Sequence, residues 1–146
     1  MNQPTTNEIL NRLLVIHNRS LPMYLNSATP WWGERDARAR DVLAQIVADQ
    51  QHMVDRIGAL ILEHGGSIEY GEFPIRFTAY HDIAGDYLLA KMIDYQQRTI
   101  AAIEKCAAQL ADEPRAHALA QQALGMARAH LDMLKELAEQ TVQSTN

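Results

Sequence analysis

The chain has 146 residues, of which 47% are hydrophobic and 21% charged, which is typical of one folded domain over residues 1–146 that buries roughly two thirds of its unfolded surface. The net charge of −5, with acidic and basic residues interspersed, excludes a nucleic-acid-binding patch, and no uncharged apolar run approaches the ~18 residues of a membrane span. The single cysteine, Cys106, excludes an internal disulfide and the polar start of the sequence lacks signal-peptide features, so we expect a cytoplasmic protein.

The first predicted helix covers residues 6–27, where apolar residues recur at the helical period. Thr5 and Glu8 have the spacing of a capping box at its start. Pro22 lies inside this segment and removes one backbone hydrogen bond. We therefore predict a kink in this helix near His17.

The second predicted helix covers about residues 34–64, with apolar residues in register along one face. It ends at Gly65, because glycine is the usual residue just past the end of a helix. Before it lies a turn over residues 28–33, where Trp31 and Trp32 are expected to cover one end of the core.

Residues 65–82 break the helical pattern with three glycines, a proline and four aromatic residues. They form a long connection between the second and third predicted helices. Aromatic residues in such a connection are typical of a covered flank or a contact between subunits. Tyr80 and His81 therefore favour a homodimer with its contact at this connection.

Two further helices complete the chain, one over about residues 83–110 and one that continues almost to the C-terminus. Asp112 is expected to cap the last helix, whose first turn contains Pro114. A short loop, a long connection and another short loop predict an all-α four-helix bundle with one crossover. The second and third helices of such a bundle run parallel.

Some polar residues share the apolar faces of these helices. Asp49 lies at the edge of such a face and His52 lies further round the helix, whereas Asp94 falls on the opposite, solvated face. Because buried polar groups require partners, the inward-facing ones are expected to meet in one layer at mid-bundle. The expected inward residues are His17, Ser20, Tyr24, Gln50, Gln96 and His130.

The segment DQQH, from Asp49 to His52, has the spacing by which metal-carrying helix bundles offer two ligands from one helix. Together with the four-helix layout, it resembles the ferritin-like superfamily, which includes bacterioferritins and rubrerythrins. The likeness covers nearly the whole chain in topology, although the motif is short. In that family two helices each carry Glu-x-x-His and two carry a glutamate, around two iron ions. The resemblance implies that Asp49 and His52 match one such pair and that His130 matches the histidine of the other.

The chain departs from the family pattern at the remaining positions. Ala127 takes the place of the second pair's glutamate, while Gln96 and His17 are the inward residues where the other two helices carry glutamates. Two metal ions ~3.5–4 Å apart need anionic bridging ligands to offset their repulsion. With Asp49 as the one remaining carboxylate, the sequence argues against a standard ferroxidase centre.

Three functional interpretations remain. In the first, His17, Asp49, His52 and His130 bind one ion of iron, zinc or manganese, and Gln50 or Gln96 contacts these ligands without binding the ion. In the second, a metal-free bundle holds a small organic ligand. In the third, the polar layer is structural and the protein acts as an interaction module. The sequence does not distinguish an enzyme from a binding protein.

Overall fold

The computed structural model describes residues 3–28, 37–80 and 85–144. These residues form helices and loops without a β-strand, which confirms the predicted all-α class. Trp31, Trp32 and His81, which the sequence places in a turn and a possible subunit contact, lie outside the described residues. The elements are α1 (Thr6–Asn18), α2 (Leu21–Ala28), α3 (Ala37–Glu63), the 3-10 helix η2 (Ile75–Tyr80), α4 (Gly85–Gln109) and α5 (Pro114–Ser144).

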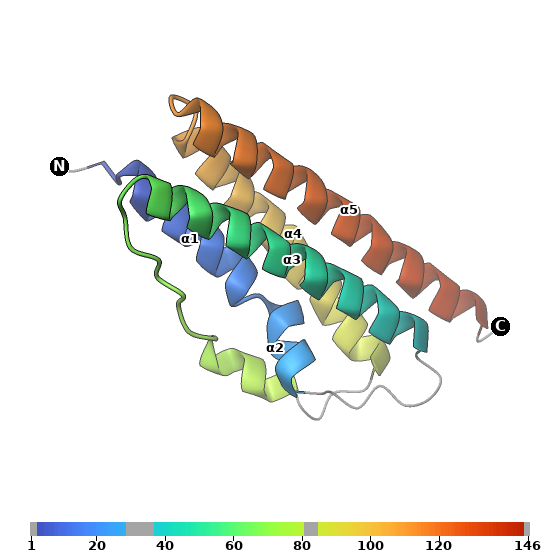
Figure 1. Ribbon diagram of the computed structural model, residues 1–146. Coiled ribbons are helices and arrows are strands. Elements are labelled where there is room, and N and C mark those ends of the chain that lie inside the picture. The colour runs from blue at the N-terminus through green and yellow to red at the C-terminus, as the bar shows by residue number, and fades with distance from the viewer. Residues whose placement is uncertain (1–2, 29–36, 81–84, 145–146) are drawn as a thin grey trace.

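The long helices lie side by side, with α1 packed against α3 and α4, and α5 packed against α4 and α3 (Figure 1). α3 and α4 run in the same direction, whereas α1 and α5 run in the opposite direction. The segment between α3 and α4 therefore returns along the length of the molecule. Within the described parts of the chain, no helix is long and apolar enough to cross a membrane.

The first predicted helix is divided into α1 and α2, a larger change than the kink expected from Pro22. Ser20 lies at the division and is fully buried. Its hydroxyl accepts a hydrogen bond from the backbone N–H of Met23 at 3.2 Å, which makes Ser20 the N-cap of α2. Pro22 then occupies the first turn of α2, where no intrahelical N–H is needed. His17 lies in the last turn of α1, beside this break.

The end of α3 follows the sequence prediction. Gly65 has a φ of +76°, and its N–H bonds to the carbonyl of Leu62 at 2.9 Å. The N–H of Gly66 bonds to the carbonyl of Ile61, also at 2.9 Å, which completes a Schellman motif. At the start of α5, Glu113 and not the predicted Asp112 directly precedes the helix, and its carbonyl accepts the N–H of His117 at 2.8 Å.

The connection between α3 and α4 is attached to α1 by side-chain hydrogen bonds. Asn11 donates to the carbonyl of Ser67 at 3.0 Å and accepts the N–H of Glu69 at 2.8 Å. Further along, Nε of Arg19 donates to the carbonyl of Gly71 at 2.9 Å. These bonds satisfy backbone groups of a segment that has little secondary structure of its own.

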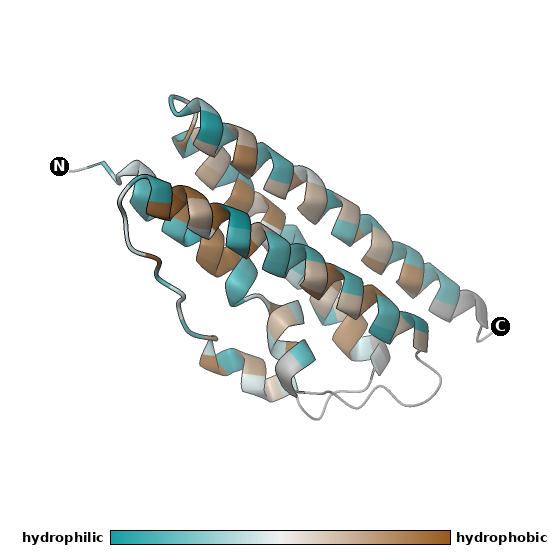
Figure 2. Ribbon diagram, in the orientation of Figure 1, coloured by the Kyte–Doolittle hydropathy of each residue, from teal (hydrophilic) through white to brown (hydrophobic). Residues whose placement is uncertain are grey.

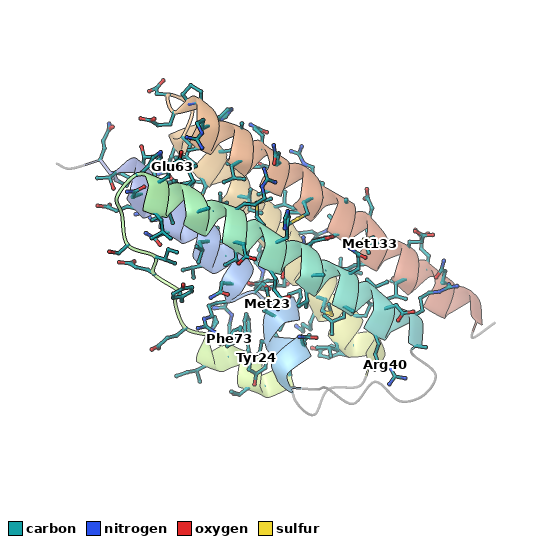
Figure 3. All side chains as sticks on the ribbon, viewed as in Figure 1. Met23, Tyr24, Arg40, Glu63, Phe73 and Met133 are labelled. Atoms are coloured by element: carbon teal, nitrogen blue, oxygen red, sulfur yellow. The ribbon has the colours of Figure 1, made fainter. Side chains whose placement is uncertain are left out.

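Aromatic residues fix the second half of this connection. Tyr24 of α2 and Phe73 lie beside each other, with ring centroids 5.4 Å apart (Figure 3). Phe77 of η2 is completely buried and packs against Tyr24 and against Tyr95 of α4, in each case with centroids 5.6 Å apart. The aromatic residues that the sequence places here thus cover the flank of the molecule beside α2.

Two separate clusters of buried apolar side chains form the core. Figure 2 shows hydrophobic parts of α3 toward both of its ends, with hydrophilic residues between them. On each helix a buried polar residue lies between members of the two clusters: Leu14 and Leu21 flank His17, and Met92 and Ile103 flank Gln96. This confirms the predicted inward positions except that of Tyr24, which is half-buried. The buried polar residues between the clusters include His17, Ser20, Gln50, Gln96 and His130, and we call these five the polar layer.

Candidate functional site

His17 of α1 has one ring nitrogen occupied and one unpaired. Nδ1 lies 2.7 Å from the carbonyl oxygen of Leu13 and therefore donates to it. Nε2 is buried and has no hydrogen-bond partner among the described residues. Burial lowers the pKa of His17 to about 4, although the bond to Leu13 raises it, and a positive charge on His130 lowers it further. At neutral pH the ring is uncharged, so Nε2 carries a lone pair.

His130 of α5 shows the same pattern with the two ring nitrogens exchanged. Nε2 lies 2.8 Å from Oδ2 of Asp49 on α3 and donates to this carboxylate. The His130 side chain is 2% exposed and that of Asp49 is 35% exposed. Nδ1 is buried and without a partner among the described residues. In its neutral form, the imidazole of His130 has its lone pair at Nδ1.

Gln96 of α4 contributes a third unpaired atom. Its Nε2 donates to the carbonyl of Ala127 at 2.9 Å, whereas its Oε1 is buried without a partner among the described residues. If the amide of Gln96 were turned over, its Oε1 would face the carbonyl oxygen of Ala127, and two acceptors would be in contact. The orientation with Nε2 toward Ala127 is therefore the chemically consistent one. Ala127 lies one turn before His130 on α5, so the side chain of Gln96 lies beside this turn.

With neutral rings, the three unpaired atoms are all acceptors: Nε2 of His17, Nδ1 of His130 and Oε1 of Gln96. They come from three different helices. Because none of them carries a hydrogen, they cannot satisfy one another. An unpaired buried polar group costs about 1–3 kcal/mol. A cation or a hydrogen-bond donor from outside the protein would satisfy such atoms.

The other members of the polar layer are paired. The hydroxyl of Ser20 donates to Oε1 of Gln50 at 2.6 Å while it accepts the N–H of Met23. This pair joins the start of α2 to the middle of α3. Its geometry is explained by helix capping and packing without any ligand.

The structure brings two of the four predicted ligands into direct contact, Asp49 and His130. His17 lies within electrostatic range of His130. His52 is exposed on α3, in line with its position away from the apolar face. Asp94 is also exposed, as predicted, and pairs with Arg98. Among the residues that the structure describes, no three His, Cys, Asp or Glu side chains lie close enough together to hold a metal ion.

Sequence reasoning missed two contacts of this site. The carboxylate of Asp49 accepts hydrogen bonds from Nε2 of His130 and from the amide of Gln45, and its predicted role as a metal ligand stays a prediction. The amide of Gln96 donates to the carbonyl of Ala127. The inward position of Gln96 was readable from the helical period, but the direction of its amide oxygen depends on the contact with Ala127 and has no sequence signal.

Other titratable residues have structural explanations. Nδ1 of His117 donates to the carbonyl of Ala107 near the end of α4, at 2.9 Å. Exposed His64 lies 3.2 Å from the amide oxygen of Asn7. Burial raises the pKa of the Cys106 thiol, and the nearby charges of Arg12 and Lys105 offset this only in part. Cys106 is therefore poorly suited to act as a nucleophile.

The donor set does not fit two metal ions. Asp49 is the carboxylate in contact with the polar layer, and it uses one oxygen for His130 and the other for Gln45. Two imidazole nitrogens and an amide oxygen are suitable ligands for a single ion.

Comparison with known proteins gives no match to a protein-family model, a curated protein or a solved structure.

Proposed function

We propose that the protein is a ferritin-like four-helix bundle that binds one transition-metal ion in its polar layer. The observation that carries this proposal is the pair of buried, unpartnered ring nitrogens, Nε2 of His17 and Nδ1 of His130. Each of these rings has its other nitrogen bound to an oxygen acceptor. This is the arrangement that orients metal-binding histidines in proteins.

The directions of the helices support the ferritin-like part of the proposal. With α1 and α2 taken together as the first helix of the bundle, α3 and α4 are its second and third helices. They run in the same direction and are joined by a long connection (Figure 1). This is the topology of ferritin-like bundles with one crossover.

Charge and ligand type restrict the ion. His17 is uncharged at neutral pH, so no proton competes for its Nε2. The carboxylate of Asp49 offsets one positive charge through His130. Imidazole ligands favour zinc and iron over manganese, which prefers oxygen ligands. We therefore expect zinc or ferrous iron to bind more tightly than manganese.

A buried water molecule is the competing occupant. Water has two hydrogens, so it can donate to only two of the three acceptors. It satisfies all three atoms only if His130 carries a second proton and donates it from Nδ1. In that case the polar layer would be structural, and the protein would act as an interaction or small-ligand-binding module.

Metal analysis of the chain purified without chelators or an affinity tag tests the proposal. We expect one ion of zinc or iron per chain, or the uptake of one added ion by the metal-free protein. His17→Ala and His130→Ala should each abolish this binding. His52→Ala and His64→Ala remove exposed histidines and serve as matched controls that retain it. Absence of binding to the unaltered chain, or loss of binding only in the two control variants, would overturn the proposal.

We also propose that the chain forms a homodimer through the connection between α3 and α4. Ile75 in η2 is 86% exposed, and Tyr70 is more than half exposed. Both residues belong to the connection where the sequence predicts a contact between subunits, and exposed apolar side chains favour such a contact. Sedimentation analysis should give a dimer that Ile75→Glu dissociates, and a monomeric unaltered chain would contradict this.

A further inference from the structure

Gln96 of α4 has a buried amide oxygen without a partner among the described residues. Its side chain is almost completely buried, and its Nε2 is fixed to the carbonyl of Ala127 at 2.9 Å. This bond fixes the direction of the amide, because Nε2 points to the carbonyl of Ala127 and Oε1 points away from it. Oε1 has no hydrogen-bond partner among the described residues. A leucine would fill the same space without leaving a buried acceptor unpaired. The amide oxygen therefore needs an explanation beyond packing.

Resting on the proposed metal binding, we infer that Oε1 of Gln96 is the third protein ligand and that it sets the metal preference of the site. The same layer contains a useful contrast, Gln50, whose Oε1 accepts the hydroxyl of Ser20. The two buried glutamines thus differ in their amide oxygens: Oε1 of Gln50 is paired, whereas Oε1 of Gln96 has no partner among the described residues.

The chemical type of this ligand explains the preference. An amide oxygen is neutral, and an imidazole binds a metal ion in its neutral form, so Gln96, His17 and His130 would form a set of three uncharged protein ligands. A carboxylate at the same place would add a negative charge and a hard oxygen ligand, which favours manganese. Gln96 therefore keeps the site selective for ions that bind imidazole well.

Calorimetric titration of the full chain with Zn²⁺ and Mn²⁺ tests this inference. Gln96→Leu should weaken Zn²⁺ binding by about tenfold or more, since even residues that only orient metal ligands affect affinity by 10–100-fold. Gln96→Glu should retain Zn²⁺ binding and raise the affinity for Mn²⁺ relative to Zn²⁺ by about tenfold. The matched control, Gln50→Leu, should leave both dissociation constants unchanged.

The outcomes separate this inference from the proposed function. Equal Zn²⁺ affinity of the unaltered chain and Gln96→Leu overturns the role of Gln96 but leaves metal binding by the histidines intact. Failure of the unaltered chain to bind any ion removes both. Circular dichroism checks the fold of each variant, and Gln96→Ala replaces Gln96→Leu if the larger apolar side chain prevents folding. The visible spectrum of bound Co²⁺ gives a second readout, because it should differ between the unaltered chain and Gln96→Leu if Oε1 is a ligand.

Discussion

Oδ2 of Asp49 on α3 lies 2.8 Å from Nε2 of His130 on α5. The pair joins a buried ring to a carboxylate that is about one third exposed. It fixes the orientation of the ring and leaves Nδ1 directed away from the carboxylate. This contact gives Asp49 a role in positioning His130, and its predicted role as a metal ligand stays a prediction.

Replacing the charge of Asp49 tests this positioning role. We expect Asp49→Asn to weaken the binding of Zn²⁺ by about 10–100-fold, because the loss of a hydrogen-bonded partner of a metal-binding histidine typically has an effect of this size. The measurement is a calorimetric titration with the ion. Asp94→Asn, which alters an exposed carboxylate paired with Arg98, is the matched control and should bind as the unaltered chain does. Equal affinity of Asp49→Asn and its control would contradict the role.

The low pKa of His17 predicts a dependence of stability on pH. The pKa falls from 6.5 in the unfolded chain to about 4 in the folded one. Between these values the unfolded state binds more protons, so the free energy of unfolding rises with pH across this window and is lost as the pH falls. At full extent the effect is about 3 kcal/mol.

Denaturant unfolding of the metal-free protein at several pH values between 4 and 7 measures this effect. His17→Leu should lose less stability than the unaltered chain as the pH falls, since leucine does not titrate. Other groups contribute equally to both proteins, so the difference between the two curves isolates His17. Parallel curves would show that His17 is not a buried neutral ring.

Bound metal should reverse the order of stability between the unaltered chain and a variant that lacks two of the unpaired atoms. In the metal-free state, His17→Leu combined with Gln96→Leu should be neutral or stabilising, because it removes two buried acceptors without partners. In the metal-bound state it should be the less stable protein. An ion at a hundredfold its dissociation constant stabilises the unaltered chain by about 3 kcal/mol. Thermal melts with and without Zn²⁺ provide the comparison, and an equal shift of both proteins by Zn²⁺ would contradict this prediction.

Ser20→Ala should destabilise the fold by about 1–3 kcal/mol. The hydroxyl caps α2 and also donates to Gln50, so its loss removes a cap and leaves a buried amide oxygen unpaired. Chemical denaturation measures the loss. Ser67→Ala, at an exposed serine of the long connection, is the control and should change stability little. A similar loss in both variants would argue against the capping role.

Two glycines with positive φ predict different costs for alanine. Gly65 has open space around the position of an added Cβ, so Gly65→Ala should cost only the left-handed backbone penalty of about 1–2 kcal/mol. At Gly71 the added Cβ would lie 2.8 Å from Cγ1 of Val15, and a β-branched side chain yields little. Gly71→Ala should therefore cost more, and Val15→Ala should remove the excess. Equal losses of stability in the two alanine variants would contradict this steric argument.

The helical period predicted the buried polar positions well, since His17, Gln96 and His130 lie where their apolar stripes place them. Pro22 indicated a disturbance of the first helix, but a complete break depends on the capping hydroxyl of Ser20, which acts only after the chain has turned. The 3-10 helix η2 escaped prediction because its single buried residue, Phe77, gives no periodic pattern.

The chemistry of the site was less predictable than its location. The spacing of Asp49 and His52 suggests that both face one ion, yet a difference of three residues on a helix leaves one of them at the edge and the other exposed. Which ring nitrogen of His130 is free depends on the contact with Asp49. These two residues are 81 positions apart in the sequence and belong to different helices, α5 and α3. Such a contact becomes visible only when the helices are assembled.

The division of the core into two apolar clusters has a consequence for how the molecule opens. Leu13 and Ile57 belong to one cluster, whereas Leu21 and Ile46 belong to the other. Local opening of protein structure follows such cooperative units, so amide hydrogens around one cluster can exchange with solvent while those around the other stay protected. An ion held between the clusters would join them into a single cooperative unit.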